Sequence, residues 1–521
     1  LLYASTWSIA NTTVSGDRLL LSQQQGNKGR VLVMDKSGAV LQTVVQDNVL
    51  LAPRQALLLQ NEVWVADSLS GLLRFAGPSA EPYRPNSPLS IALGEMVACD
   101  GTLWVASGAV TAAWANTFTK NGLYRFAGET WTNYNKSSLP VFDSLYDIIT
   151  VAADPTDNSA WAGSFGGGLL HLANDNTLQV FKQNSPLPSS AADPTKYYIA
   201  GLAFDGDNNL WIASYGGRQP LSVKKADGSW RSFSPPFVIS GNAVSQVVTD
   251  DYNQVWMVSP ANGLLCFNRG ASVDNPADDK WKLYQPGAGS GNLPSAHVLC
   301  IARDKNSFIW VGTDHGIGII QCGQDVFSAQ GCDAVLPVVQ QDNFAGYLFS
   351  DEQVQCIATD GADRKWVGTK NGVWLLSADG QQILYRFTVT NSPLLNNDVR
   401  KIAIDGKSGE VFFATASGIC SFRSTATDGG ATNSNVLVFP NPVPPGYNGS
   451  IAIRGLADNA TVKITELNGR LVYETRALGG QAIWNGKDYN GRNIATGVYL
   501  VLVSDDSRQQ KTATKIVFIS K

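Results

Sequence analysis

The side chains best suited to binding a ligand lie in loops that follow a repeated WVGT-like segment. In SYGGRQP an aromatic ring and a guanidinium stand three residues apart. An aromatic ring can stack on the face of a sugar, and Arg or Lys pairs with an acid group. This combination predicts binding of an anionic sugar, and the alternative is that each residue is an ordinary solvated loop position. The candidate ligand-binding residues are Trp114, Tyr215, Arg218, Asp314, His315 and Lys370.

Residue patterns typical of enzymes do not occur in the chain. The three histidines, His171, His297 and His315, belong to three different repeats. The sequence contains no HExxH, GxSxG or Walker motif, and no pair of cysteines with metal-ligand spacing. We therefore expect no catalytic residue, no metal and no cofactor. A pair of carboxylates brought together from different repeats stays open as an alternative.

Composition narrows the class of protein further. The 521 residues are 44% apolar and only 16% charged, which predicts large buried cores and two or three domains. A net charge of -4 gives no general attraction to nucleic acid or anionic lipid. No run reaches the roughly 18 apolar residues of a membrane helix. The N-terminus has neither an initiator Met nor a charged segment followed by an apolar one, so we expect Leu1 to be an internal start.

The elements that position these loops are predicted to be β-strands. Fifty glycines, 14 tryptophans and scarcely any helical periodicity favour short strands joined by tight turns. An aromatic strand recurs every 40 to 57 residues, which is typical of a four-stranded β-propeller blade. We expect each recurring Trp to pack between blades rather than to bind a ligand. The aromatic positions are Trp64, Trp104, Trp161, Trp211, Trp256, Trp310, Trp366 and Phe412.

Counting repeats predicts a seven-bladed β-propeller. Seven units run from Ile91 to Phe422, and the last has only three strands of its own. An unpaired edge exposes backbone donors and acceptors, so we expect Ala80 to Pro88 to supply the missing strand. The predicted domains are residues 78–425 for this propeller and residues 1–77 for the last blades of a preceding propeller. One larger ring of eight or nine blades is the alternative.

Seven cysteines occur along the chain. Cys300 and Cys356 occupy the same place in successive repeats, so they are expected to be buried thiols. Cys322 and Cys332 lie in a loop outside the repeat, ten positions apart, which allows a short disulfide in an oxidising compartment. Free thiols at these two positions are the alternative.

A small C-terminal β-domain is predicted for residues 436–521, after a linker at residues 426–435. Alternating apolar residues and Asn-Gly turns predict about seven antiparallel strands in an immunoglobulin-like sandwich. Four ordered motifs cover this segment: an opening PNP, an LNGR turn, a WNGKDYNGR hairpin with a GVY strand, and a closing basic-apolar strand. Their marker residues are Pro440, Asn441, Pro442, Gly469, Trp484, Gly497, Tyr499 and Lys515.

These motifs closely resemble the C-terminal sorting domain of proteins exported by the type IX secretion system of Bacteroidetes. The Trp repeats resemble two-component regulator propeller repeats. An accessory immunoglobulin-like domain is the alternative for the C-terminal segment. The resemblance implies recognition by the type IX translocon, export through the periplasm, and a place at the bacterial cell surface in association with the outer membrane.

The combination of domains resembles a surface component of the type IX attachment complex. That resemblance implies a non-enzymatic scaffold working with the sortase PorU and the outer-membrane barrel protein PorV, and binding anionic lipopolysaccharide or a related glycan. No ligand residue is carried over from a family motif. The alternative is an exported type IX cargo that acts as a glycan-binding adhesin or a polysaccharide-active protein.

Overall fold

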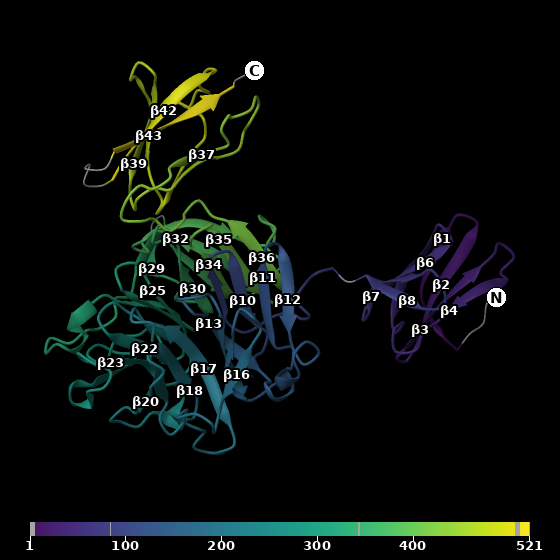
Figure 1. Ribbon diagram of the computed structural model, residues 1–521, viewed down its shortest axis with the longest axis horizontal. Helices are drawn as coiled ribbons and strands as arrows, with labels where there is room; N and C mark the ends of the chain where they lie inside the picture. The colour runs from purple at the N-terminus through teal and green to yellow at the C-terminus, as the bar shows by residue number, and fades with distance from the viewer. Residues whose placement is uncertain (1–5, 84, 342–343, 506–510, 520–521) are drawn as a thin grey trace. The chain divides into compact units, whose positions relative to one another are not determined.

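A computed structural model describes residues 6–83, 85–341, 344–505 and 511–519. The chain is all-β, and it divides into two compact units, residues 1–87 and residues 88–521 (Figure 1). Unit 1 contains two four-stranded antiparallel sheets, in the orders β1-β2-β3-β4 and β5-β6-β7-β8, which share one apolar core. Its strands are β1 (Ser8–Ser15), β2 (Arg18–Gln25), β3 (Lys28–Met34), β4 (Val40–Val44), β5 (Pro53–Leu59), β6 (Glu62–Asp67), β7 (Gly71–Phe75) and β8 (Ala80–Tyr83).

The larger part of unit 2 consists of seven antiparallel sheets that follow one another along the chain. The first four are formed by β9 (Met96–Cys99), β10 (Thr102–Ala106), β11 (Leu123–Ala127) and β12 (Thr130–Tyr134), then β13 (Ile148–Ala153), β14 (Ala160–Gly166), β15 (Gly168–Leu172) and β16 (Leu178–Phe181), then β17 (Tyr197–Phe204), β18 (Leu210–Ser214), β19 (Leu221–Lys224) and β20 (Trp230–Phe233), then β21 (Val247–Thr249), β22 (Gln254–Ser259), β23 (Gly263–Asn268) and β24 (Lys280–Tyr284).

The last three sheets are formed by β25 (Val298–Arg303), β26 (Ile309–Thr313) and β27 (Gly316–Ile320), then β30 (Cys356–Thr359), β31 (Lys365–Thr369), β32 (Gly372–Leu376) and β33 (Ile383–Phe387), then β34 (Val399–Asp405), β35 (Glu410–Thr415) and β36 (Gly418–Arg423). A hairpin of β28 (Val338–Gln341) and β29 (Phe344–Tyr347) follows the fifth sheet. Short 3-10 turns are η1 (Pro140–Ser144), η2 (Ser240–Asn242), η3 (Pro276–Asp278) and η4 (Gly323–Phe327).

The innermost strands of the seven sheets form a closed ring. Each inner strand contacts the inner strand of the next sheet, in the order β9, β13, β17, β21, β25, β30 and β34, and β34 contacts β9. This arrangement is that of a β-propeller, which confirms the predicted fold class. Among the described residues, the ring closes without a strand from unit 1, while the predicted number of blades stays a prediction.

The prediction for the closing strand is wrong. The stretch expected to close the ring, Ala80 to Pro88, contains β8, which pairs with β7 in unit 1. A turn of only four residues joins β7 to β8, so their hairpin forms with little loss of chain entropy. Among the described residues, the last sheet keeps three strands, and the ring closes through packing of β34 against β9. The assignment of residues 1–77 to a preceding propeller stays a prediction.

The recurring Trp residues hold the sheets together from inside. Trp211 is fully buried, and it packs in one cluster with Val247 on the next inner strand. Its indole Nε1 donates to Asp205 Oδ2 at 2.9 Å, while Asp205 Oδ1 accepts from the backbone N–H of Asn209 at 2.9 Å. One carboxylate therefore closes the turn between two strands and fixes the indole. The same Trp-to-Asp bond occurs at Trp161, Trp256, Trp310 and Trp366.

The C-terminal domain contains seven strands in two sheets, in the orders β37-β38-β41 and β40-β39-β42-β43. Trp484, Val462 and Val501 are buried in the core between them. This arrangement confirms the predicted β-sandwich. Its strands are β37 (Leu437–Phe439), β38 (Ile451–Arg454), β39 (Thr461–Glu466), β40 (Leu471–Arg476), β41 (Gln481–Trp484), β42 (Gly497–Ser504) and β43 (Lys511–Phe518).

The segment that leaves the propeller after β36 is packed rather than extended into solvent. Ser424, Ala426 and Thr427 are buried. Arg364 directly precedes β31 of the sixth sheet. Its guanidinium donates to Ser424 Oγ at 2.9 Å and to Thr425 Oγ1 at 3.2 Å. Ser424 and Thr425 lie just before the predicted linker, and within it Asp428 N–H donates to Gly406 O of the last sheet at 2.7 Å, so the start of the linker is also bound to the propeller.

Candidate functional site

The loop between β10 and β11 carries the first predicted ligand-binding residue, Trp114. Its turn places Trp114 at a positive φ of 55° and is closed by a bond from Trp114 N–H to Thr111 O of 2.9 Å. The buried Asp147 carboxylate accepts from the backbone N–H groups of Thr117, Phe118 and Thr119 at 2.9, 2.9 and 2.7 Å. A single carboxylate therefore fixes the loop that presents the indole.

Trp114 forms one wall of an aromatic groove. Its ring stacks on Tyr215 with centroids 4.8 Å apart and planes 10° from parallel. The centroid of the Phe165 ring lies 5.4 Å from that of Tyr215 and 4.6 Å from that of Tyr198. These four rings, with Phe118, line an open hollow of about 400 Å³. Flat aromatic faces around an open hollow suit the apolar face of a sugar ring.

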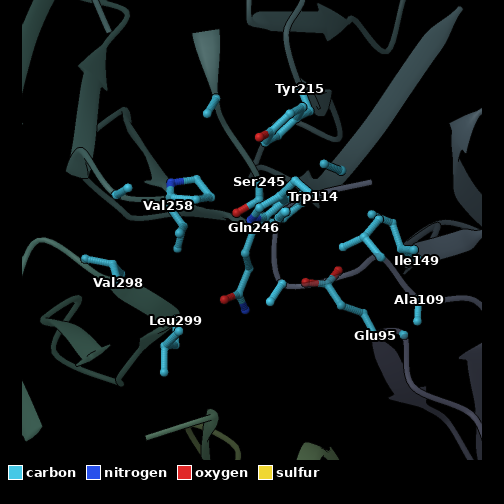
Figure 2. A pocket seen from close by; sticks show the side chains of 18 of the residues that line it. Glu95, Ala109, Trp114, Ile149, Tyr215, Ser245, Gln246, Val258, Val298 and Leu299 are labelled. Carbon is cyan, nitrogen blue, oxygen red and sulfur yellow. The ribbon is translucent and has the colours of Figure 1, made fainter. Parts of the chain in front are cut away.

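The groove adjoins the mouth of the central channel, a cavity of about 620 Å³ that Trp114 and Tyr215 also line. Figure 2 shows the Glu95 and Gln246 side chains directed into this channel. Burial raises the pKa of Glu95, against the opposing effects of the Lys401 charge and a 2.5 Å hydrogen bond from Thr150 Oγ1. The channel is therefore lined partly by hydrogen-bonding groups, and its mouth is aromatic on one side.

The other predicted ligand residues lie elsewhere on the propeller. Arg218 and Lys370 are exposed, and neither lines the groove or the channel mouth. His315 Nδ1 lies 3.0 Å from Asp314 Oδ1 in the turn between β26 and β27. The structure thus brings together Trp114 and Tyr215 but not the four charged or polar candidates. Ligand binding by any of the six stays a prediction.

Sequence reasoning missed Phe165, Tyr198 and the channel residues Glu95 and Lys401. Phe165 and Tyr198 are cross-strand partners in the pairing of β14 with β17, a link between two sheets that the blade repeat does not predict. The only local signals were the aromatic residue that opens FGGG and those within KYY. Neither signal says that the two rings meet.

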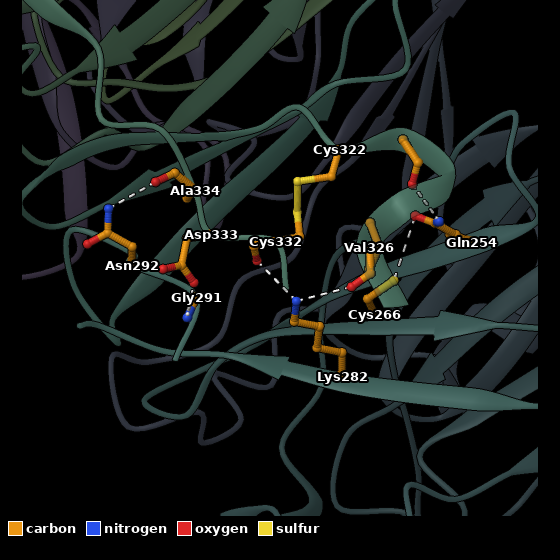
Figure 3. The surroundings of a disulfide bond; sticks show 11 residues. Gln254, Cys266, Lys282, Gly291, Asn292, Cys322, Val326, Cys332, Asp333 and Ala334 are labelled. Carbon is orange, nitrogen blue, oxygen red and sulfur yellow. Dashed lines mark hydrogen bonds between the residues drawn. A yellow bond between two sulfur atoms is a disulfide. The ribbon is translucent and has the colours of Figure 1, made fainter. Parts of the chain in front are cut away.

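Cys322 and Cys332 form a disulfide in the structure, with their Cα atoms 6.1 Å apart (Figure 3). The Lys282 ammonium donates to the carbonyl oxygens of Val326 and Cys332 at 3.1 and 3.0 Å within the loop that the disulfide closes. Cys300 and Cys356 are buried thiols, and burial raises the pKa of both groups. The loop and its disulfide lie away from the aromatic groove.

The marker residues of the C-terminal motifs have structural contacts. Asn441 donates through Nδ2 to Lys515 O at 2.9 Å and accepts through Oδ1 from Val517 N–H at 3.0 Å, so the PNP segment is bound to β43. Trp484 Nε1 donates to Lys487 O, and Tyr499 Oη donates to Ala495 O, both at 2.9 Å. Gly469 turns at a positive φ of 88°. Pro440 and Pro442 lie in the segment that directly follows β37, and Gly497 is the first residue of β42.

Within the described residues, no three His, Cys, Asp or Glu side chains gather as potential metal ligands. In the same part of the chain, no helix combines the length and hydropathy needed to cross a bilayer.

Comparison with known proteins agrees with this architecture. Residues 437–519 match the family described as the secretion system C-terminal sorting domain, and residues 292–315 match the two component regulator propeller. No curated protein matches the chain. Two solved structures show weak similarity. The extracellular domain of the putative one component system BT4673 from B. thetaiotaomicron is 11% identical over 99% of this chain and 98% of that one, with a TM-score of 0.24. YCF48 from Cyanidioschyzon merolae is 14% identical over 65% of this chain and 96% of that one, with a TM-score of 0.44.

The fold and the matched domains define a β-propeller protein with a secretion-system C-terminal sorting domain. Among solved structures it is similar to PorZ, a bacterial surface component of the type-IX secretion system of Porphyromonas gingivalis. The two chains are 25% identical, with a TM-score of 0.70, and the similarity covers 99% of this chain and 71% of PorZ. The chain is therefore PorZ-like in its propeller and in its sorting domain.

Proposed function

We propose that this protein is a non-enzymatic cell-surface component of the type IX secretion system that binds a glycan through its aromatic groove. The similarity to PorZ over 99% of the chain is the observation that carries the secretion role. The match of residues 437–519 to a sorting domain supports export to the surface. The full proposal places the protein in an attachment complex with the sortase PorU and the barrel protein PorV, at the outer membrane.

The glycan proposed is lipopolysaccharide carrying acidic groups. The half-buried rings of Trp114, Tyr198 and Tyr215 around one open hollow, packed on the buried Phe165, support binding of a sugar, because an aromatic ring gains from contact with an apolar sugar face. The groove is about 400 Å³, which is within the size range of sites that bind small ligands or single sugar residues. A scaffold needs such a groove to hold a glycan, whereas an enzyme would also need reacting groups in the same hollow.

Deleting the gene in a bacterium that encodes the protein tests the secretion role. We expect other proteins with sorting domains to accumulate unprocessed, and we expect a chain lacking residues 436–521 to fail to restore them. Normal maturation of those proteins in the deletion strain would contradict the proposal. It would favour the alternative of an exported cargo acting as an adhesin, for which the mass of the mature protein should show loss of residues after about Asn435.

Binding of lipopolysaccharide purified from the same bacterium tests the groove separately. We expect Trp114→Ala to weaken binding by up to about tenfold, since loss of one stacked ring costs on the order of 0.5 to 1.5 kcal/mol. Tyr385→Ala is the matched control, because Tyr385 lies on β33 and is 64% exposed. Equal losses in both variants would show that the groove does not hold the glycan.

A further inference from the structure

Two lysines flank a turn of three glycines next to the aromatic groove. The turn, Gly166 to Gly168, joins β14 to β15. A Cβ atom at Gly166 would lie 2.5 Å from Tyr146 Oη, and one at Gly168 would lie 2.8 Å from Lys182 Cγ. Gly166 and Gly168 also have φ values of +120° and +92°, which side chains disfavour. The local sequence therefore has to be glycine for Tyr146 and Lys182 to approach the turn this closely.

The two lysines, Lys182 and Lys196, repel each other and have no carboxylate partner. Burial and the Lys196 charge both lower the pKa of Lys182. Lys196 Nζ donates to Tyr146 Oη at 3.0 Å, and this bond, together with the Asp193 charge, raises the pKa of Lys196. Among the described residues no carboxylate lies within ion-pair distance of either lysine, and the Asp193 carboxylate accepts from Thr195 N–H and Oγ1 at 2.9 and 2.7 Å. Two lysine side chains beside one glycine turn offer donors to an acid group.

The lysines are continuous with the groove through Tyr146. The Tyr146 ring lies 5.4 Å from Phe118, which lines the groove, and its hydroxyl bonds Lys196. Lys196 also directly precedes β17, two residues before the groove residue Tyr198. An acid group bound by the lysines would therefore belong to a molecule that also reaches the aromatic rings.

We propose that Lys182 and Lys196 form an anion subsite for the acidic substituent, phosphate or carboxylate, of a sugar whose ring stacks in the aromatic groove. The inference deepens the proposed function and rests on it for the glycan, while the subsite itself rests on the lysine pair and the glycine turn. Charge-assisted hydrogen bonds from two ammonium groups are stronger than neutral ones, so the subsite would select acidic sugars over neutral ones.

The full chain, titrated with defined sugars and followed by ligand-observed NMR, tests the subsite. The probes are glucose, galactose and mannose, their 6-phosphates, their uronic acids, and inorganic phosphate alone. We expect at least one acidic sugar to bind about tenfold more tightly than its neutral parent at low salt, and the phosphate and uronate arms to show which acid is preferred. The double variant Lys182→Ala/Lys196→Ala should abolish this preference, and Lys182→Arg/Lys196→Arg should retain it.

Control variants separate failure of the subsite from failure of the glycan proposal. Lys280→Ala removes one exposed charge elsewhere and should leave every probe unaffected. Trp114→Ala should weaken acidic and neutral sugars equally while leaving inorganic phosphate unchanged. Equal binding of acidic and neutral sugars to the unchanged protein, or an unaltered preference in the double alanine variant, would overturn the subsite. Binding of phosphate by the lysines without binding of any sugar would support the subsite and contradict the glycan proposal.

Discussion

Replacing Asp147 by Asn should release the loop that presents Trp114. Asp147 Oδ2 accepts from Thr117 N–H, Phe118 N–H and the Asn116 amide, and Oδ1 accepts from Thr119 N–H and the Thr117 hydroxyl. An asparagine keeps the shape of the side chain, but its NH₂ group then faces at least one backbone N–H whichever way it turns. At least two donors lose their acceptor in either orientation.

The magnitude follows from the cost of an unsatisfied buried donor, about 1 to 3 kcal/mol each. Two such donors lower the free energy of opening the loop by about 2 to 6 kcal/mol in total. The corresponding increase in hydrogen exchange is about 30-fold to about 20,000-fold at the amides of Thr117, Phe118 and Thr119. Mass spectrometry of peptides spanning the loop measures this directly, and peptides from β22 and β23 serve as an internal reference.

The matched control is Asp143→Asn. Asp143 is about half exposed and pairs with Lys120 and Lys136 at 2.9 and 3.1 Å, so solvent screens its ion pairs and its loss should leave the loop unaffected. Unchanged exchange at Thr117 to Thr119 in Asp147→Asn would refute the role of the buried carboxylate. A loop that opens without any loss of lipopolysaccharide binding would instead separate loop order from ligand binding.

Three further predictions concern stability. Serine at both Cys322 and Cys332 should lower the urea midpoint by an amount equivalent to about 2 to 3 kcal/mol, since the disulfide closes a loop of sequence separation 10; labelling of all seven thiols in unreduced, denatured protein would disprove the bridge. Lys365→Met should destabilise the propeller by about 3 to 5 kcal/mol in thermal unfolding, because the buried Asp304 carboxylate, 3.1 Å from the ammonium, loses its partner; a loss below about 1 kcal/mol would argue against this ion pair. Because burial raises the pKa of Glu95, the native state binds its proton more tightly than the unfolded chain, so stability falls as pH rises above the ordinary value near 4.5. Glu95→Gln should therefore be more stable than the unchanged protein at neutral pH, with a difference that vanishes in acid, and a difference independent of pH would contradict the assignment.

The repeat and the C-terminal motifs could be predicted from the sequence because each has a local physical cause. Trp211 and Asp205 recur at fixed spacing since one hydrogen bond fixes both the turn and the indole. The closing strand could not be predicted, because Ala80 to Pro88 has strand character whether it pairs with β7 or with β36. Its partner depends on the short turn that precedes it, and that local pairing prevails.

The aromatic groove was only half predictable for a different reason. Trp114 and Tyr215 follow recognisable repeat strands, so their loops could be identified as candidates. Phe165 and Tyr198 meet only because β14 extends past its own sheet to pair with β17. Long-range pairing of this kind leaves no periodic signal in the sequence. The same pairing brings Lys196 beside the glycine turn against which Lys182 packs.

The packed exit after β36 determines how the propeller responds to mechanical load. The chain enters the ring at β9 and leaves it after β36, and these two ends flank the one seam, β34 against β9, that no connecting segment bridges. A pull on the C-terminal domain would peel β36 from β35 one hydrogen bond at a time if that strand alone held the exit. Arg364 ties Ser424 and Thr425 to the sixth sheet, so the load is shared by two sheets and acts as shear across them. Part of the tension on the sorting domain therefore bypasses the sheet that forms the seam.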